Sequence, residues 1–156
     1  MSSSGWTHVA SRDCATASRW PANAQGAAHA PRLRICMLSM HSCPLGDLGT
    51  RDTGGMSVYI RELAGALADR GHEIDIYTRG HAPHHDHRDG TLELKPGVRL
   101  MHLPAGPPSG LSSRKQFSLV PAFTAELTSH MLSADRGCDL LHSHYWLSGC
   151  VGRQLQ

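Results

Sequence analysis

The chain has 156 residues, a length that fits one compact domain with its own hydrophobic core. Its formal net charge is only +2 at pH 7, and no run of lysine and arginine concentrates that charge, so we expect no nucleic-acid partner. No apolar run approaches the ~20 residues that span a bilayer, and the N-terminus lacks a signal-peptide pattern. The 5 cysteines show no CxxC spacing, which is typical of free thiols in a reducing compartment. We therefore expect a soluble protein of the cytoplasm without a membrane span.

The first part of the chain differs in composition from the rest. Residues 1–31 are rich in serine, alanine, glycine and proline and have no sustained apolar period, which predicts a disordered tail. From Arg32 the pattern changes to a near-continuous apolar run that continues to Met40, as in a strand buried on both faces of a parallel sheet. We predict that residues 32–156 form the folded domain.

The next elements follow from periodicity. Apolar residues from Met56 to Leu67 recur at helical spacing, and Gly71 follows as a helix terminator. Residues 73–79 alternate apolar and polar side chains, which predicts a second strand. Two short strands, at 92–94 and 98–103, are then predicted around a Pro-Gly turn.

The last third of the chain returns to helical patterns. Residues 117–134 show helical spacing, and Pro121 predicts either a kink or a true start near Leu119. Residues 138–142 predict another buried strand, and helical spacing resumes from Tyr145 to the end. This order of elements predicts an α/β fold with a Rossmann-like, doubly wound parallel sheet.

Ligands of open α/β sheets bind outside the carboxyl ends of the strands, so the loop after the first strand is a candidate site. It contains His41 and Asp52, and it ends in Gly54 and Gly55 at the start of a helix. Paired glycines permit close backbone approach, and free N–H groups at a helix start attract phosphate. The spacing is not GxGxxG, so no dinucleotide is predicted, and a purely structural connection between strand and helix stays open.

A second loop rich in polar and aromatic side chains follows the predicted strand at 138–142. His142, His144, Tyr145 and Trp146 form a polar and aromatic cluster of the kind that lines sugar-binding clefts. The two histidines have no clear third ligand, so we predict no metal there.

Two other groupings have alternative interpretations. The histidine-rich tract 81–89 has a metal-like composition, but its spacing matches no standard ligand set, so we interpret it as a solvated loop. Cys43 lies near His41 and could form a Cys/His pair, although a core or loop thiol is the favoured interpretation.

Two segments together, 39–60 and 139–149, resemble the N-terminal domain of glycosyltransferase family 4, whose enzymes have the GT-B fold. The resemblance covers roughly residues 32–153, and it is strongest to the D-inositol-3-phosphate glycosyltransferases and the sucrose-phosphate synthases. It implies that this chain is the N-terminal, acceptor-side half of a GT-B fold and that the C-terminal donor domain is absent.

The resemblance also implies a reaction. Family members transfer a sugar from a nucleotide-sugar donor, here most commonly a UDP-sugar, to a small polyol or sugar acceptor with or without a phosphate, and they retain the anomeric configuration. No further cofactor and no metal are implied. The alternative is a non-catalytic Rossmann-like module that binds a small phosphorylated ligand.

The candidate substrate-binding residues are carried over onto matching positions or lie beside them. They are His41, Asp52, Thr53, Gly54, Gly55, Met56, Ser57, Lys115, His144 and Tyr145. Among them, Tyr145 matches a tyrosine at the acceptor phosphate, and Lys115 lies close to the position of a phosphate-binding lysine. No catalytic residue is assigned.

Overall fold

The structure is a computed structural model, in which Arg32–Gln156 forms one compact unit. It describes residues 31–46, 54–80, 91–107, 111–134 and 137–156. The predicted tail, apart from Pro31, and the histidine tract 81–89 lie outside the described residues.

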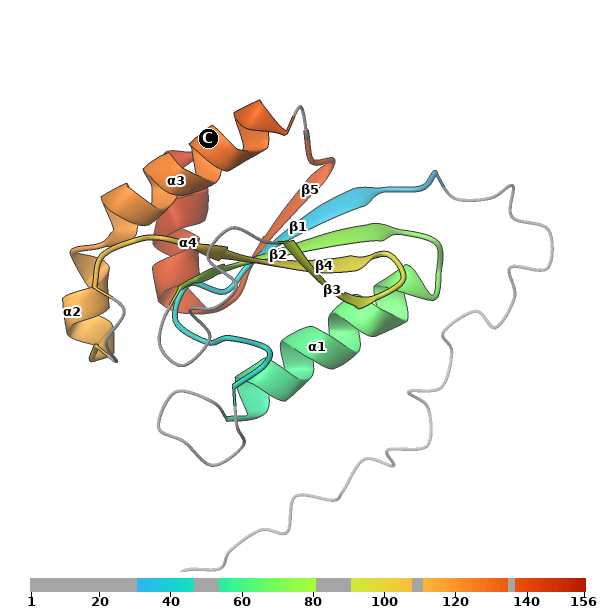
Figure 1. The fold of residues 1–156 in the computed structure, drawn as a ribbon, viewed down its shortest axis with the longest axis horizontal. Helices are drawn as coiled ribbons and strands as arrows, with labels where there is room; N and C mark the ends of the chain where they lie inside the picture. The colour runs from blue at the N-terminus through green and yellow to red at the C-terminus, as the bar shows by residue number, and fades with distance from the viewer. Residues whose placement is uncertain (1–30, 47–53, 81–90, 108–110, 135–136) are drawn as a thin grey trace, which may run out of the picture. The chain divides into compact units, whose positions relative to one another are not determined.

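Five strands form one sheet in the order β3-β4-β2-β1-β5 (Figure 1). Their bounds are β1 Arg34–Leu38, β2 Glu73–Arg79, β3 Thr91–Lys95, β4 Val98–Leu103 and β5 Leu140–Ser143. Strands β4, β2, β1 and β5 run parallel, whereas β3 forms an antiparallel hairpin with β4. The sheet is therefore mixed, and with its flanking helices it confirms the predicted Rossmann-like α/β fold.

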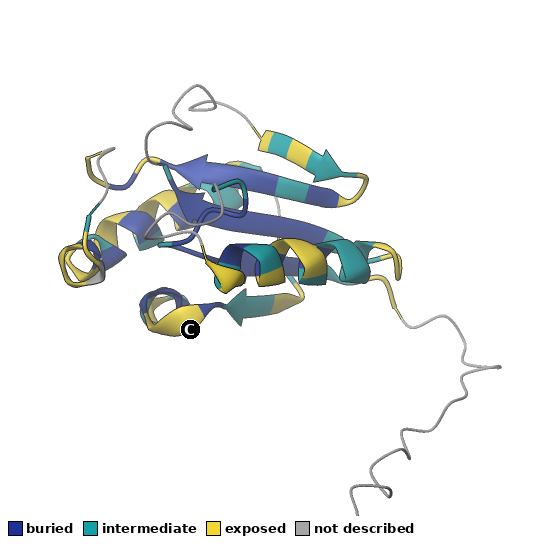
Figure 2. Cartoon of the chain, turned by 90° about the horizontal axis from the view of Figure 1, so that it is seen from below, coloured by how far each residue is buried: buried dark blue, intermediate teal, exposed yellow. Residues whose placement is uncertain are grey.

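Helices cover both faces of the sheet and enclose two apolar cores. Their bounds are α1 Gly55–Ala68, α2 Ser113–Phe117, α3 Val120–Ser133 and α4 Tyr145–Gln154. Helix α1 packs Ile60 and Ala64 into a cluster with Ile76 and other residues of the strands. On the opposite face, α3 and α4 bury Phe123 and Leu147 in a second cluster. Figure 2 shows the central strands as the most buried layer between these helices.

Most predicted elements are confirmed. The end of α1 illustrates the physical reason, because a glycine follows the helix where the sequence predicted its terminator. Helix α1 ends at Ala68, and Gly71 follows with φ 92°, a left-handed conformation that favours glycine. The N–H of Gly71 then donates to the carbonyl of Ala68 at 2.8 Å, which satisfies one of the last helical carbonyls.

One prediction is confirmed in its second alternative, and another needs correction. The helix predicted within 117–134 starts at Val120, next to Leu119, with Pro121 in its first turn, where no N–H is needed, and Phe117 ends the separate short helix α2. Strand β5 is not buried like β1, because it pairs with β1 alone and is an outer strand of the sheet. Leu140 at its start is accordingly 49% exposed.

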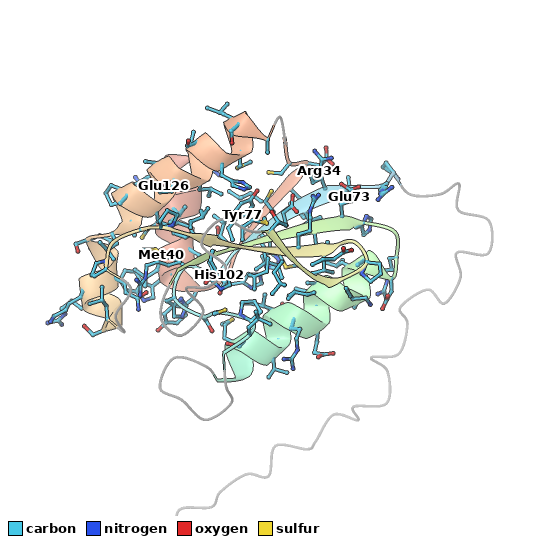
Figure 3. All side chains as sticks on the ribbon, viewed as in Figure 1. Arg34, Met40, Glu73, Tyr77, His102 and Glu126 are labelled. Atoms are coloured by element: carbon cyan, nitrogen blue, oxygen red, sulfur yellow. The ribbon has the colours of Figure 1, made fainter. Side chains whose placement is uncertain are left out.

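The parallel strands define two edges of the sheet, which we call the amino edge and the carboxyl edge. Figure 3 shows Arg34 and Glu73, which begin β1 and β2, at one end, and Met40 and His102 at the other. None of the helices in the described part of the chain combines the length and the apolar character needed to cross a bilayer.

Candidate functional site at the carboxyl edge

The sheet order places a topological switch point at the carboxyl edge of β1 and β5. From β1 the chain passes through α1 to β2 on one side, whereas β5 and α4 lie on the other side. Strand order thus reverses between β1 and β5, and ligands of open α/β sheets bind at such switch points. The loops after these two strands, together with the first turns of the helices that follow them, contain all of the predicted site residues except Lys115.

The start of α1 forms one wall of the candidate site. Gly54 caps the helix in an extended conformation, Gly55 is its first residue, and among the described residues no side chain caps the helix and no acidic side chain lies in its first turn. A Cβ atom at either glycine would meet no atom of the described neighbours within 4 Å, and neither has a left-handed backbone. The first N–H groups of a helix have no intrahelical partner, so this terminus, whose first two residues carry no side chain, offers hydrogen-bond donors. Asp52 and Thr53 lie outside the described residues.

Met56 and Ser57 face inward, toward the core beneath α1. Met56 packs against the core cluster beneath α1. Ser57 is only 2% exposed, and its hydroxyl lies 2.7 Å from the hydroxyl of Ser42. Ser39 in turn donates its hydroxyl to the carbonyl of Ser42 at 2.6 Å. These bonds fasten the loop after β1 to the first turn of α1.

The same loop is fastened to α4 on the other wall. The N–H of Met40 donates to the Ser148 hydroxyl at 3.1 Å, and the N–H of His144 donates to the Leu38 carbonyl at 2.9 Å. As a result the rings of His41 and Tyr145 contact each other, with centroids 4.5 Å apart. Tyr145 has φ 69°, a left-handed conformation that costs a non-glycine residue about 1–3 kcal/mol and clusters at functional sites.

His144 lies between the walls. Its ring contacts Tyr59 of α1 at 5.8 Å and His142 of β5 at 4.2 Å between centroids. Burial, assisted by His142, lowers the pKa of His144 to about 4, so the imidazole is neutral at pH 7. Its Nε2 atom is buried and has no hydrogen-bond partner among the described residues. A buried nitrogen of this kind suits a hydroxyl group of a ligand.

Lys115 belongs to α2, a short helix that is held in place from both sides. The buried Gln116 donates its amide to the Leu111 carbonyl at 2.8 Å, and the Phe117 ring packs on Trp146 of α4. Lys115 itself is exposed. The structure thus brings the helix that carries Lys115 against the helix that begins with Tyr145.

The favoured interpretation of Cys43, a core or loop thiol, agrees with its place in the core cluster beneath α1. The Sγ atom of Cys43 lies 3.3 Å from Nε2 of His102, and burial raises the pKa of the thiol. A protonated, buried thiol is a poor nucleophile, which favours the interpretation of Cys43 as a core residue. Within the described ranges no group of three or more histidine, cysteine, aspartate or glutamate side chains could hold a metal ion.

Sequence reasoning missed the serines that build the site. Ser42 and Ser148 were not predicted to matter, yet their hydroxyls join the loop after β1 to α1 and to α4. A small polar residue next to an apolar run was the available signal, but only the structure gives its partner. Tyr59 was also missed as a neighbour of His144, since its helical spacing indicated a core position.

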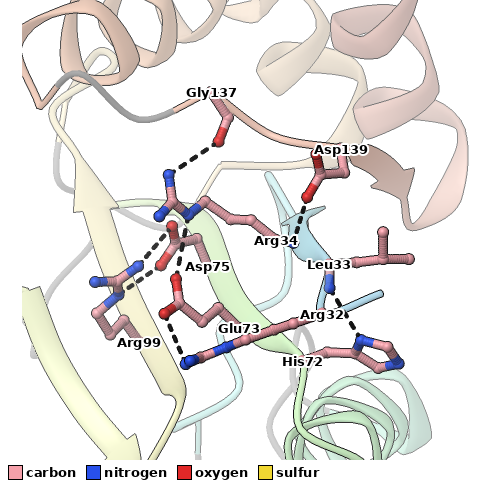
Figure 4. A network of polar contacts seen from close by, with 9 residues as sticks. All are labelled: Arg32, Leu33, Arg34, His72, Glu73, Asp75, Arg99, Gly137 and Asp139. Carbon is pink, nitrogen blue, oxygen red and sulfur yellow. Dashed lines mark hydrogen bonds and ion pairs between the residues drawn. The ribbon is translucent and has the colours of Figure 1, made fainter. Parts of the chain in front are cut away.

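The amino edge has the opposite character, with its charges paired (Figure 4). Arg99 donates two hydrogen bonds, of 2.7 and 3.0 Å, to the buried carboxylate of Asp75. Arg34 and Arg32 both pair with Glu73, and the hydrogen bond from Arg34 is the main cause that lowers the pKa of that carboxyl. We interpret this network as structural.

The comparisons with known proteins identify the family of the chain. The family model described as "Glycosyl transferase 4-like domain" matches residues 54–156. The chain belongs to this glycosyltransferase family. Its resemblance to family 4 is thereby confirmed.

Relatives with assigned names give the same result. The chain is 44% identical over 139 residues to a D-inositol 3-phosphate glycosyltransferase of Streptomyces griseus, covering 86% of this chain and 28% of that protein. It is 42% identical over 120 residues to the enzyme of that name from Xylanimonas cellulosilytica, covering 76% and 28%. Among solved structures it matches sucrose-phosphate synthase of Thermosynechococcus elongatus with a TM-score of 0.71 and 36% identity, covering 80% and 30%. The chain therefore spans less than a third of the length of these relatives.

Proposed function

We propose that this chain is the acceptor-side part of a retaining glycosyltransferase that moves a sugar from a UDP-sugar to a small polyol or sugar acceptor. The family assignment supports the reaction class, and relatives named for D-inositol 3-phosphate make a phosphorylated cyclic polyol the first acceptor to test. The donor side would lie in the part of these relatives that this chain does not match, so we expect no turnover by residues 1–156 alone.

The open glycine pair at the start of α1 carries this proposal. A glycine in a loop usually serves a left-handed turn or a close packing contact. Gly54 and Gly55 have neither a left-handed backbone nor, among the described residues, a close neighbour. Their exposed surface instead leaves the N–H groups of the helix start accessible to an anion. The transfer develops negative charge on the departing diphosphate, and such donors stabilise that charge.

The opposite wall supplies groups suited to the acceptor. The phenol of Tyr145 and the ammonium of Lys115 can bind a phosphate, and both side chains are exposed. The neutral His144 can exchange a hydrogen bond with a sugar or polyol hydroxyl. We propose a cytoplasmic location, which the free thiols of the four described cysteines support.

The test is a substitution at the glycine pair in a protein that carries the donor side. Residues 32–156 are fused to the remaining part of the Streptomyces griseus relative, and transfer from UDP-sugars to D-inositol 3-phosphate is measured. We expect Gly55→Val to lower transfer at least ~100-fold, as loss of oxyanion stabilisation does. Thermal unfolding should change little, because valine at an exposed helix start costs below ~1 kcal/mol.

Gly137→Val is the matched control, because Gly137 also has open space around its Cα but lies at the amino edge. This variant should transfer normally. Normal transfer by a folded Gly55→Val protein would contradict the phosphate site, and unfolding of that variant would favour a purely structural role for the glycine. Absence of transfer in the unsubstituted fusion, while it binds the acceptor, would favour the non-catalytic module.

A further inference from the structure

Three exposed rings form a continuous row beside the candidate site. The Tyr145 and Trp146 centroids are 6.4 Å apart, and those of Trp146 and Phe117 are 5.7 Å apart with the ring planes inclined by 31°. The exposed fractions of Tyr145, Trp146 and Phe117 are 52%, 45% and 53%. The row thus runs from the ring that contacts His41 across the start of α4 to the end of α2.

This exposure is unusual for side chains of this size. Tyr77 and Phe123 are fully buried in the core of the same domain, where rings make their largest contribution to stability. Adjacent exposed rings form an apolar surface that gains free energy when a ligand covers it. The row shares Tyr145 with the proposed acceptor site, so the two surfaces are continuous.

The charges around the row indicate what covers it. Helix α2 carries Arg114 and Lys115, both exposed, and the last turn of α4 carries Arg153. Neither helix contains an aspartate or a glutamate. The row is thus an apolar surface whose two helices carry cationic side chains and no carboxylate. Such a surface is complementary to a ligand that has both an apolar face and an anionic group.

We propose that Trp146 and Phe117 form a stacking shelf that selects acceptors with a saturated ring. The C–H face of the ring covers the two side chains while its phosphate lies toward Tyr145 and Lys115. An open-chain polyol phosphate has the same polar groups, but it must lose chain entropy to present a flat apolar face. This inference rests on the proposed function, because it assumes that the acceptor binds at the carboxyl edge.

The shelf can be observed directly through its own indole. The chain has 3 tryptophans, and two of them, Trp6 and Trp20, lie in the predicted tail. Replacing those two with phenylalanine leaves Trp146 as the single indole whose fluorescence reports a ring placed on it. The two probes are D-inositol 3-phosphate and sorbitol 6-phosphate, which have the same numbers of carbons, free hydroxyls and phosphates and differ in ring closure. Calorimetry with the same protein gives both affinities independently.

We expect D-inositol 3-phosphate to change the Trp146 emission saturably and to bind about tenfold more tightly than sorbitol 6-phosphate, the ratio that one aromatic contact typically provides. Phe117→Leu keeps an apolar side chain but loses the ring, and it should reduce this preference to about twofold. Leu132→Ala, an exposed apolar residue of α3, is the control and should keep the full preference. Thermal unfolding of each variant checks that it is folded.

The remaining outcomes separate the shelf from the proposed function. Equal affinities for the two probes, or an unchanged preference in Phe117→Leu, would overturn the shelf and leave the acceptor site in place. Binding of neither probe in calorimetry would overturn the acceptor site at this edge and the shelf with it.

Discussion

At the amino edge of the sheet the charged side chains of β1, β2 and β4 are paired with one another, whereas the carboxyl edge has exposed rings and a buried polar atom that lacks a hydrogen-bond partner among the described residues. Asp75 is buried and held by two hydrogen bonds from Arg99, and Glu73 receives Arg32 and Arg34. At the other end, α1 starts without a side-chain cap and Nε2 of His144 has no partner in the described ranges.

The difference indicates how one sheet would separate stability from the binding that we propose. Paired groups at the amino edge have little left to offer a ligand, because their hydrogen-bonding capacity is used within the fold. The carboxyl edge includes a left-handed tyrosine and a buried histidine whose Nε2 has no hydrogen-bond partner among the described residues, and both features cost stability. Substitutions at the amino edge should therefore change mainly the free energy of unfolding, whereas substitutions at the carboxyl edge should also change ligand affinity.

The largest loss of stability is expected at the amino edge. Asp75→Ala removes a buried carboxylate and leaves the guanidinium of Arg99, which is 25% exposed, without its partner. We expect the free energy of unfolding to fall by ~3 kcal/mol and Tm by roughly 10 °C. Acceptor affinity, measured by calorimetry at a temperature where the variant is folded, should be unchanged.

The control for this substitution is Arg32→Ala. The Arg32 side chain is 68% exposed, so its pair with Glu73 should contribute less than ~0.5 kcal/mol. A weakened acceptor affinity in folded Asp75→Ala would contradict the separation of the two edges.

A pH-dependent effect of at most similar size is expected from His144 at the carboxyl edge. Its folded-state pKa of about 4 is below the ordinary value of 6.5, so the unfolded chain binds the proton more tightly. The neutral ring therefore contributes its full stability above pH 6.5, and this contribution is lost as pH falls toward 4, by roughly 3 kcal/mol at most.

Urea unfolding of the wild type and of His144→Gln between pH 4.5 and 7 checks this expectation. The pH dependence of the free energy of unfolding should be clearly shallower in the variant. An identical slope in both proteins would show that another group titrates in this range.

The smallest effect is expected from the Ser148 hydroxyl, which joins α4 to the loop after β1. Ser148→Ala leaves the N–H of Met40 without its acceptor in a buried position, at a cost of ~1–2 kcal/mol. Because Met40 precedes His41, acceptor affinity should also fall, and calorimetry with thermal unfolding measures both. Ser133→Ala removes an exposed hydroxyl on α3 and should change neither. Unchanged acceptor affinity in Ser148→Ala would show that α4 and the loop after β1 keep their relative positions without this hydrogen bond.

Much of the fold could be predicted, because the spacing of apolar residues along the chain indicates which side chains are buried. The apolar run ending at Met40 and the alternation at 73–79 indicated strands that the structure confirms as β1 and β2. Helix α1 was predicted from one apolar face and from Gly71. The break between α2 and α3 was less clear, since a short helix followed by a longer one keeps almost the same apolar spacing.

The candidate site was predictable only in part. Gly54, Gly55 and Tyr145 could be named because their residue types and their places after predicted strands indicate the carboxyl edge. The inward position of Ser57 could not be named, because its partner Ser42 is set by the path of the loop. The same limit applied to Cys43, which lies near His41 in sequence but contacts His102 in space.

The sequence by itself determined which segments become strands and helices, since apolar periodicity measures which side chains leave water. It also determined the family, through glycines and aromatic residues whose types and order need no coordinates. Only the tertiary structure decided which groups are satisfied and which stay open. Whether His144 finds a partner, or Phe117 meets Trp146, depends on strand order and on helices packed from distant parts of the chain. Hydrogen bonds and ring contacts act over a few ångströms in space, and distance along the sequence does not report that separation.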